Sequence, residues 1–192
     1  MFHAQTPDDQ ILTYKSGGSG SGIVPVASGE APLDEEVVKN GGFEDGMRNW
    51  QLKPGDVARV SIAKPGHESR KAAKIVGTGS AGTLVTFSQT SQLNAPPGAC
   101  FRYSVWTRGS KLSRPLVVWA SLIHPDGSAS PQLAAGSRRQ GVGPGSSPWR
   151  RSVDTGVLKD AIVGMTIFAA DTGQVPITGT AWVDNLSLRR TC

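Results

Sequence analysis

Asn40-Gly-Gly-Phe-Glu-Asp-Gly-Met-Arg-Asn-Trp50, near the start of the chain, and Ala181-Trp-Val-Asp-Asn-Leu-Ser-Leu188, near its end, decide the fold. Each stretch places an acidic residue beside apolar residues that suit a strand. Between the two stretches lie short β-type segments and no convincing helix. The sequence therefore predicts a closed β-sandwich whose first and last segments lie side by side.

The composition of the 192-residue chain favours turn-rich β structure over helix. The sequence holds 24 Gly and 13 Pro, and only 18% of its residues are charged. Its hydrophobic content of 38% is enough for a single core. No apolar run approaches the length of a membrane span, so no spanning segment is predicted.

The charge pattern argues against a nucleic-acid partner. The formal net charge is +5, but the basic residues are scattered, and Arg138-Arg139, Arg150-Arg151 and Arg189-Arg190 are pairs, not runs. A nucleic-acid surface would gather basic residues on one element and interleave aromatic residues. We expect a solvated basic surface, and the alternative is attraction to an acidic polymer such as a uronic-acid polysaccharide.

Alternation and turn signals such as His124-Pro-Asp-Gly predict an all-β antiparallel sandwich, or jelly roll. The segment Phe101–Thr107 alternates well and places Phe101, Tyr103 and Val105 on one face. Residues 136–148 form the longest stretch without a strand, a length typical of mobile or functional loops. The predicted strands are Val37–Asn40, Val57–Ala63, Ala72–Val76, Thr83–Leu93, Cys100–Arg108, Leu116–His124, Trp149–Thr155, Ala161–Ala170 and Thr180–Leu188.

The first 35 residues are predicted to lie outside the domain. Residues 16–22, Ser-Gly-Gly-Ser-Gly-Ser-Gly, are typical of an engineered flexible linker, which makes residues 1–15 foreign to the domain. That segment is either a fusion remnant or a tethered partner peptide, bound by strand addition or on a sheet face. Residues 23–35 are an extended lead-in, and the jelly-roll domain covers residues 36–192.

Cys100 and Cys192 are the two cysteines of the chain. An even pair in a β-rich chain is compatible with one disulfide, and two free thiols are the alternative. A disulfide would place the protein in an oxidising location, which is extracellular, periplasmic or at the cell surface.

Four blocks of the sequence resemble the carbohydrate-binding modules of families 4, 9 and 22, within the galactose-binding-like jelly-roll group. The resemblance covers residues 37–188 and implies two face-to-face sheets of four or five strands, with the first and last strands together. The matching blocks are Asn40-Gly-Gly-Phe-Glu-Asp-Gly…Trp50, then Gln92-Leu…Pro97-Gly…Tyr103-Ser-Val-Trp-Thr, then Trp149 with Ser152, and finally Trp182-Val-Asp-Asn-Leu-Ser-Leu.

The resemblance also implies a structural calcium ion at the junction of the first and last strands. The positions that match the ligands are Glu44 and Asp184, with main-chain carbonyl groups around Gly42 supplying other oxygens. Calcium takes six or more oxygen ligands, so two carboxylates from distant segments would cross-link the fold. The alternative is that both carboxylates accept hydrogen bonds from main-chain donors or pair with Arg or Lys.

Sugar recognition uses flat aromatic faces together with amides and Arg. Trp50 and Trp182 match family positions that are structural, and we expect both to be buried. Trp106 and Trp119 are the candidate sugar platform. Trp106 is out of phase with Phe101, Tyr103 and Val105, so it should share the opposite face with Arg102. The polar residues that we expect to complete the platform are Arg102, Arg108, Gln89 and Gln132.

Catalytic signals are nearly absent from the sequence. The three histidines have no metal-ligand spacing, and neither a Gly-x-Ser-x-Gly motif nor a phosphate-binding loop is present. We therefore expect a non-catalytic extracellular or cell-surface module that binds a polysaccharide or glycan. The alternative is a protein-interaction or structural module on the same fold, with residues 1–15 as its peptide partner.

Overall fold

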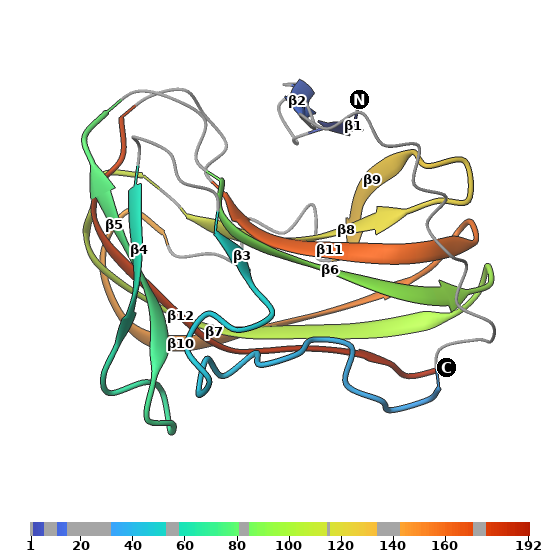
Figure 1. Ribbon diagram of the computed structural model, residues 1–192, viewed down its shortest axis with the longest axis horizontal. Helices are drawn as coiled ribbons and strands as arrows, with labels where there is room; N and C mark the ends of the chain where they lie inside the picture. The colour runs from blue at the N-terminus through green and yellow to red at the C-terminus, as the bar shows by residue number, and fades with distance from the viewer. Residues whose placement is uncertain are drawn as a thin grey trace.

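The computed structural model describes residues 2–5, 11–14, 32–52, 58–80, 85–114, 116–133, 143–170 and 176–192. These residues form two five-stranded antiparallel sheets packed face to face, in the orders β10-β7-β12-β5-β4 and β3-β6-β11-β8-β9 (Figure 1). The strands are β3 (Gln51–Leu52), β4 (Ala58–Ala63), β5 (Ala72–Thr78), β6 (Val85–Ala95), β7 (Cys100–Leu112), β8 (Val117–Ile123), β9 (Ala129–Leu133), β10 (Gly145–Val157), β11 (Ile162–Ala170) and β12 (Thr178–Arg190). The predicted all-β sandwich is confirmed.

Strand β7 shows how the sequence places one side of each strand in the core. Phe101, Tyr103 and Val105 are fully buried between the sheets, while Arg102 and Arg108 are exposed on the outer face. Because side chains alternate along a strand, Trp106 also lies on the outer face, as predicted. The alternation of β7 therefore separates the core from the surface that carries the candidate site.

Strand β12 changes phase in its middle. Ala181 and Val183 point into the core before the change, and Leu186 and Leu188 do so after it. The pairing with β7 shifts between Asp184 and Ser187, and Asn185 has a φ of 47°. An extra residue at this β-bulge keeps the apolar side chains inside and turns Asp184 to the outer side of the sheet.

The first and last segments of the domain lie side by side, as the two motifs predicted. The main-chain N–H of Val37 donates to Leu188, and that of Leu186 donates to Gly41. A Cβ atom on Gly41 would stand 2.0 Å from the carbonyl oxygen of Leu186, so only glycine permits this approach. The motif around residue 40 is therefore fitted to the main chain of β12.

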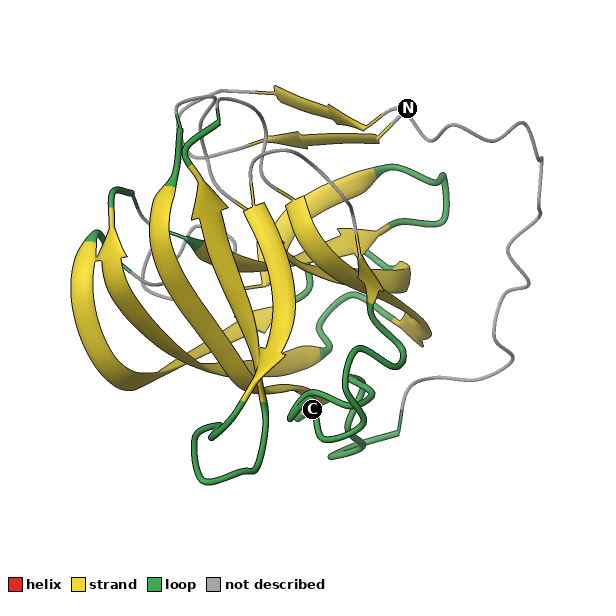
Figure 2. Ribbon diagram, turned by 60° about the vertical axis from the view of Figure 1, so that its left-hand side comes forward, coloured by secondary structure: helices red, strands yellow, loops and turns green. Residues whose placement is uncertain are grey.

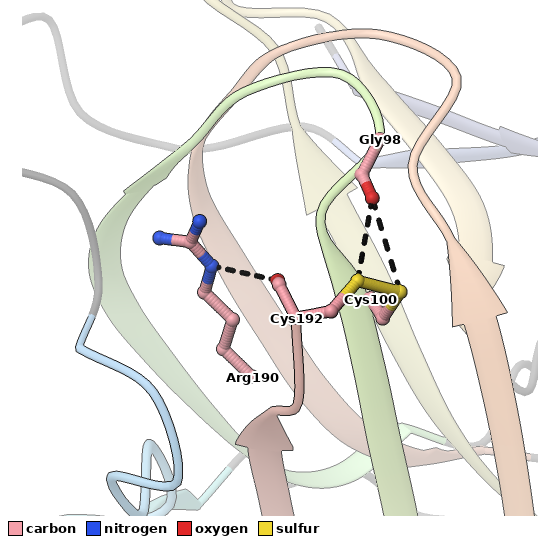
Figure 3. The surroundings of a disulfide bond; sticks show 4 residues. All are labelled: Gly98, Cys100, Arg190 and Cys192. Carbon is pink, nitrogen blue, oxygen red and sulfur yellow. Dashed lines mark hydrogen bonds between the residues drawn. A yellow bond between two sulfur atoms is a disulfide. The ribbon is translucent and has the colours of Figure 1, made fainter.

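The predicted disulfide is present. Cys100 at the start of β7 is joined to Cys192, 92 residues later, with their Cα atoms 4.8 Å apart. Figure 3 shows the carbonyl oxygen of Gly98 close to both sulfur atoms, and the Nε of Arg190 donating to Cys192. The N–H of Thr191 also donates to Cys100, so the last residues continue along β7 after β12 ends.

Three differences separate the predicted strands from the observed ones. Residues 37–40 do not form a strand: the chain there makes turns, with a positive φ at Asn40. Two short strands, β3 and β9, were missed, because β3 has only two residues and β9 contains Pro131, which does not favour a strand. Strand β10 begins at Gly145 and so takes up the end of the predicted 136–148 loop, whose residues 136–142 lie outside the described residues.

The N-terminal segment contributes a hairpin of its own. Strands β1 (Phe2–Gln5) and β2 (Ile11–Tyr14) pair with each other as a two-stranded sheet near β9. In the described part of the chain, no pairing joins this hairpin to either large sheet. Binding of this segment as an added strand is therefore a prediction that no observed pairing supports, and the predicted linker, residues 16–22, lies outside the described residues.

Within the described ranges, no helix is long and apolar enough to cross a membrane.

Candidate functional site

The β4–β5 loop, residues 64–71, folds over the outer side of β12 because it is fastened to Asp184. One carboxylate oxygen of Asp184 accepts from the main-chain N–H of His67 at 2.7 Å and from the Ser69 hydroxyl at 2.6 Å. The other accepts from the N–H of Asn185 at 2.8 Å. Burial of this fully enclosed carboxylate raises its pKa, and it outweighs the opposite effect of the three hydrogen bonds.

Gly66 completes the enclosure of Asp184. A Cβ atom on Gly66 would stand 2.6 Å from an oxygen of Asp184, 2.1 Å from the Ser69 hydroxyl and 2.2 Å from the Lys71 carbonyl oxygen. No side chain can be accommodated at such distances, so glycine is required for the loop to close around the carboxylate.

Glu44 fastens the other end of the same loop. Its carboxylate accepts from the main-chain N–H groups of Arg70 at 2.8 Å and Lys71 at 3.0 Å, and pairs with the Arg70 side chain at 3.1 Å. The ammonium group of Lys71 donates to the carbonyl oxygen of Glu44. Desolvation works to raise the pKa of Glu44, but the hydrogen bonds from Lys71 and Arg70 outweigh it and hold the pKa below its ordinary value.

These contacts bear on the predicted calcium ion. Gly42 does lie beside Asp184 and Asn185, but every oxygen of both carboxylates already accepts a hydrogen bond from the protein. Calcium binds oxygen ligands, so it would have to displace those donors from the carboxylates and the Lys71 ammonium group from the carbonyl oxygen of Glu44. Among the described residues, no group of three or more His, Cys, Asp or Glu could hold a metal ion. The residues present do not fit calcium, and the ion stays a prediction.

Trp106 lies under the fastened loop. The imidazole of His67 stacks on its ring with the centroids 3.5 Å apart and the planes 17° apart, and Trp149 meets the imidazole edge-on at 5.6 Å. The Nδ1 atom of His67 is buried, and within the described residues it has no hydrogen-bond partner. One face of Trp106 is therefore covered by the protein itself and is closed to a sugar ring.

Trp182 lies two residues before Asp184 on β12, and Asp184 is paired with Trp106. It belongs to a row of outward side chains that crosses the sheet. In the strand register it lies directly opposite Arg108 of β7 on one side and Lys74 of β5 on the other. The guanidinium carbon of Arg108 is 4.8 Å from the ring centroid of Trp182, and the Lys74 ammonium group is 6.0 Å from it. Both are within the range of cation–π attraction, which contributes about 0.5–1 kcal/mol at exposed sites.

We call this surface the Trp182 face and define it as the outward side chains of the β10-β7-β12-β5-β4 sheet. Figure 2, in which β4 and β5 come forward, shows the strands of this sheet side by side. The expected burial of Trp182 is wrong, because the bulge in β12 follows Trp182 and leaves its ring partly exposed on this face. Its exposed or half-exposed members include Trp182, Arg108, Lys74, Trp149, Arg102, Arg151 and Arg59.

The predicted platform is split between the two outer surfaces of the sandwich. Arg102, Trp106 and Arg108 lie together on the Trp182 face, whereas Trp119 lies on β8 of the other sheet. Trp119 is only 4% exposed, although it points away from the core, so its ring offers no open face. The structure thus brings Trp106 and Trp119 nowhere near each other.

Neither of the two predicted glutamines is carried by a strand of the Trp182 face. The amide of Gln89 is buried. Its oxygen accepts from the main-chain N–H of Lys39 at 2.7 Å, and its NH₂ group donates to the carbonyl oxygens of Lys39 at 2.7 Å and Asn49 at 3.2 Å. It fastens the turn-rich segment after residue 36 to β6. Gln132 lies in β9, and its side chain lies outside the described residues.

Two of the three residues in the row Arg108–Trp182–Lys74, Lys74 and Trp182 itself, were not among the predicted binding residues. Lys74 follows two alanines in β5, and its place opposite Trp182 depends on a pairing between segments more than 100 residues apart. The sequence pattern gives the face on which each side chain lies, but it does not give the neighbour across the sheet.

Comparison with known proteins gives the fold and not a family. No family model matches the chain, and no curated protein matches it. Among solved structures, the enzymatically active domain of bacteriophage CBA120 tailspike protein 4 aligns with a TM-score of 0.60 at 16% identity, over 81% of this chain and 21% of that one. The chain therefore spans about a fifth of that protein.

Carbohydrate-binding modules align over nearly their whole length. The xylan-binding domain CBM22-1 of Paenibacillus barcinonensis Xyn10C gives a TM-score of 0.56 at 13% identity, over 85% of this chain and 98% of that one. TmCBM61 in complex with β-1,4-galactotriose gives 0.54 at 17% identity, over 81% and 99%. The predicted resemblance to carbohydrate-binding modules is confirmed at the level of the fold.

Proposed function

We propose that this chain is a non-catalytic carbohydrate-binding module of an extracellular or cell-surface protein. The fold that it shares with carbohydrate-binding modules supports binding of a glycan, and the disulfide suits an oxidising location. A fold alone does not carry a function, so the proposal depends on a surface that suits the ligand.

The observation that carries the proposal is the half-exposed indole of Trp182 between Arg108 and Lys74. The part of the indole that stays exposed offers apolar surface to the C–H groups of a sugar ring, and the two cations that lie over the indole donate hydrogen bonds to the sugar oxygens. Because the three side chains come from three neighbouring strands, the sheet holds them in fixed positions, which lowers the entropy lost on binding.

Affinity electrophoresis and calorimetry against a panel of neutral and acidic polysaccharides test the proposal. We expect at least one polysaccharide to bind and Trp182→Ala to abolish that binding. Leu33→Ala is the matched control, because Leu33 is 60% exposed and lies outside the strands. Binding that survives Trp182→Ala would move the site elsewhere, and failure of the whole panel would refute the function. Release of reducing ends from a bound polysaccharide would refute its non-catalytic character.

A further inference from the structure

We propose that the ligand of the Trp182 face is an anionic glycan whose carboxylates are bound by Arg108 and Lys74. This inference rests on the carbohydrate-binding function proposed above and names the class of ligand. Among the described residues, the outward positions of the sheet carry several cations that take no part in the ion pairs of Glu36 and Glu44.

Five cations of the face come from four of its five strands. Arg108 and Arg102 lie on β7, Lys74 on β5, Arg59 on β4 and Arg151 on β10, and the strand register turns all of them outward with Trp106 and Trp182. Four of the five, all but Lys74, are exposed. Part of the positive charge of the chain, whose formal net charge is +5, therefore lies on one sheet surface.

Three of the described carboxylates near this face are already used by other groups of the protein. Asp184 is the acidic residue among the outward positions described, and it is fully buried and used by His67, Ser69 and Asn185. Glu36 pairs with Arg189 at 3.2 Å, and Glu44 pairs with Arg70. The ion pairs of the described residues therefore involve neither Arg108 nor Lys74, and both cations lie against the Trp182 ring.

The row Arg108–Trp182–Lys74 places one cation on each side of one aromatic ring. The strands that carry them are two spacings apart, or about 10 Å. A sugar ring against the indole then has a cation within reach on both sides for a carboxylate of its own or of the next residue. Since the indole already holds both cations, little side-chain freedom is lost when the anion binds.

A pair of polymers that differ only in charge tests this inference. Polygalacturonate carries a carboxylate on each residue, and its fully methyl-esterified form has the same backbone without the charge. We expect the wild-type protein to bind the acid at least about tenfold more tightly than the ester in low salt, and to lose this difference as NaCl is raised.

Variants locate the effect. The double change Lys74→Gln and Arg108→Gln should weaken polygalacturonate binding about tenfold, and the double change Lys74→Arg and Arg108→Lys should restore most of it. Lys159→Gln is the control, since Lys159 is exposed in the β10–β11 loop and lies outside the face. An unchanged melting temperature shows that each variant is folded.

The possible failures are distinct. If the ester binds as tightly as the acid, or if the double Gln variant binds like wild type, the charge inference is overturned while the carbohydrate-binding function stands. If single-stranded DNA binds as tightly as polygalacturonate at the same salt, the face is a general polyanion surface and the inference is also overturned. If neither polymer nor any neutral polysaccharide binds, the proposed function itself fails.

Discussion

The carboxylate of Asp184 accepts a 2.7 Å hydrogen bond from the main-chain N–H of His67, a residue 117 positions earlier in the chain. This contact joins the bulge of β12 to the β4–β5 loop. Through the loop it also sets the stacking of His67 on Trp106. One buried carboxylate thus holds the loop that covers a face of Trp106.

Asp184→Asn should destabilise the protein by about 2–3 kcal/mol. The amide keeps one acceptor oxygen but turns an NH₂ group toward donors, so that buried donors lose their partner. Equilibrium unfolding in urea at neutral pH measures the change. Asp160→Asn is the matched control, because Asp160 is exposed in a loop and should change the free energy of unfolding by less than about 0.5 kcal/mol. Equal effects of the two substitutions would contradict the role of Asp184.

The free energy of unfolding should depend on pH in the acid range because of Glu44. Its pKa is lowered in the folded state from an ordinary value of 4.5, so the folded protein binds this proton less tightly than the unfolded chain does. The stabilising contribution is therefore present above pH 4.5 and is lost as the pH falls through the folded pKa. In Glu44→Gln this loss should be absent, so the difference in stability between the two proteins should narrow as the pH falls below 4.5 and through the folded pKa. A constant difference between them from pH 7 to pH 3 would refute the prediction.

Calcium at millimolar concentration should leave the melting temperature unchanged. The carboxylates of Glu44 and Asp184 are occupied by protein donors, and the Lys71 ammonium group lies on the carbonyl oxygen of Glu44. A ligand that binds only the folded state raises its stability, so a saturating rise in melting temperature would show that calcium displaces these donors. Magnesium at the same concentration controls for ionic strength.

His67→Ala should uncover Trp106. Loss of the imidazole that stacks at 3.5 Å exposes the indole to water, which should move the tryptophan emission to longer wavelength and increase quenching by acrylamide. The same change made in a Trp106→Phe background should have no such effect, which assigns the signal to this ring. An unchanged spectrum in the single variant would mean that another group covers Trp106.

Removal of the disulfide should lower stability without changing the fold. Cys100 and Cys192 close a loop of 92 residues, for which the chain-entropy model gives up to about 4–5 kcal/mol. The pairing of β12 with β7 already brings these ends together, so the double change to serine should still give a folded protein. Urea unfolding of the oxidised, reduced and doubly substituted proteins measures the effect. The reduced wild type should match the double variant.

The sequence alone determined the class of fold and its closure. The motif at Asn40–Trp50 and the motif at Ala181–Leu188 carry local turn and strand chemistry, which predicted the sandwich and the adjacency of its ends. The outward placement of Trp106 also followed from alternation in β7, because side-chain direction is a local property of a strand.

Only the tertiary structure decided the site. Trp106 and Trp119 have similar sequence surroundings, yet they lie on different sheets, and a loop 117 residues from Asp184 covers one of them. Trp182, expected in the core, instead stands between Arg108 and Lys74. Strand order and register bring these three side chains together, and both depend on contacts between distant segments that no local pattern encodes.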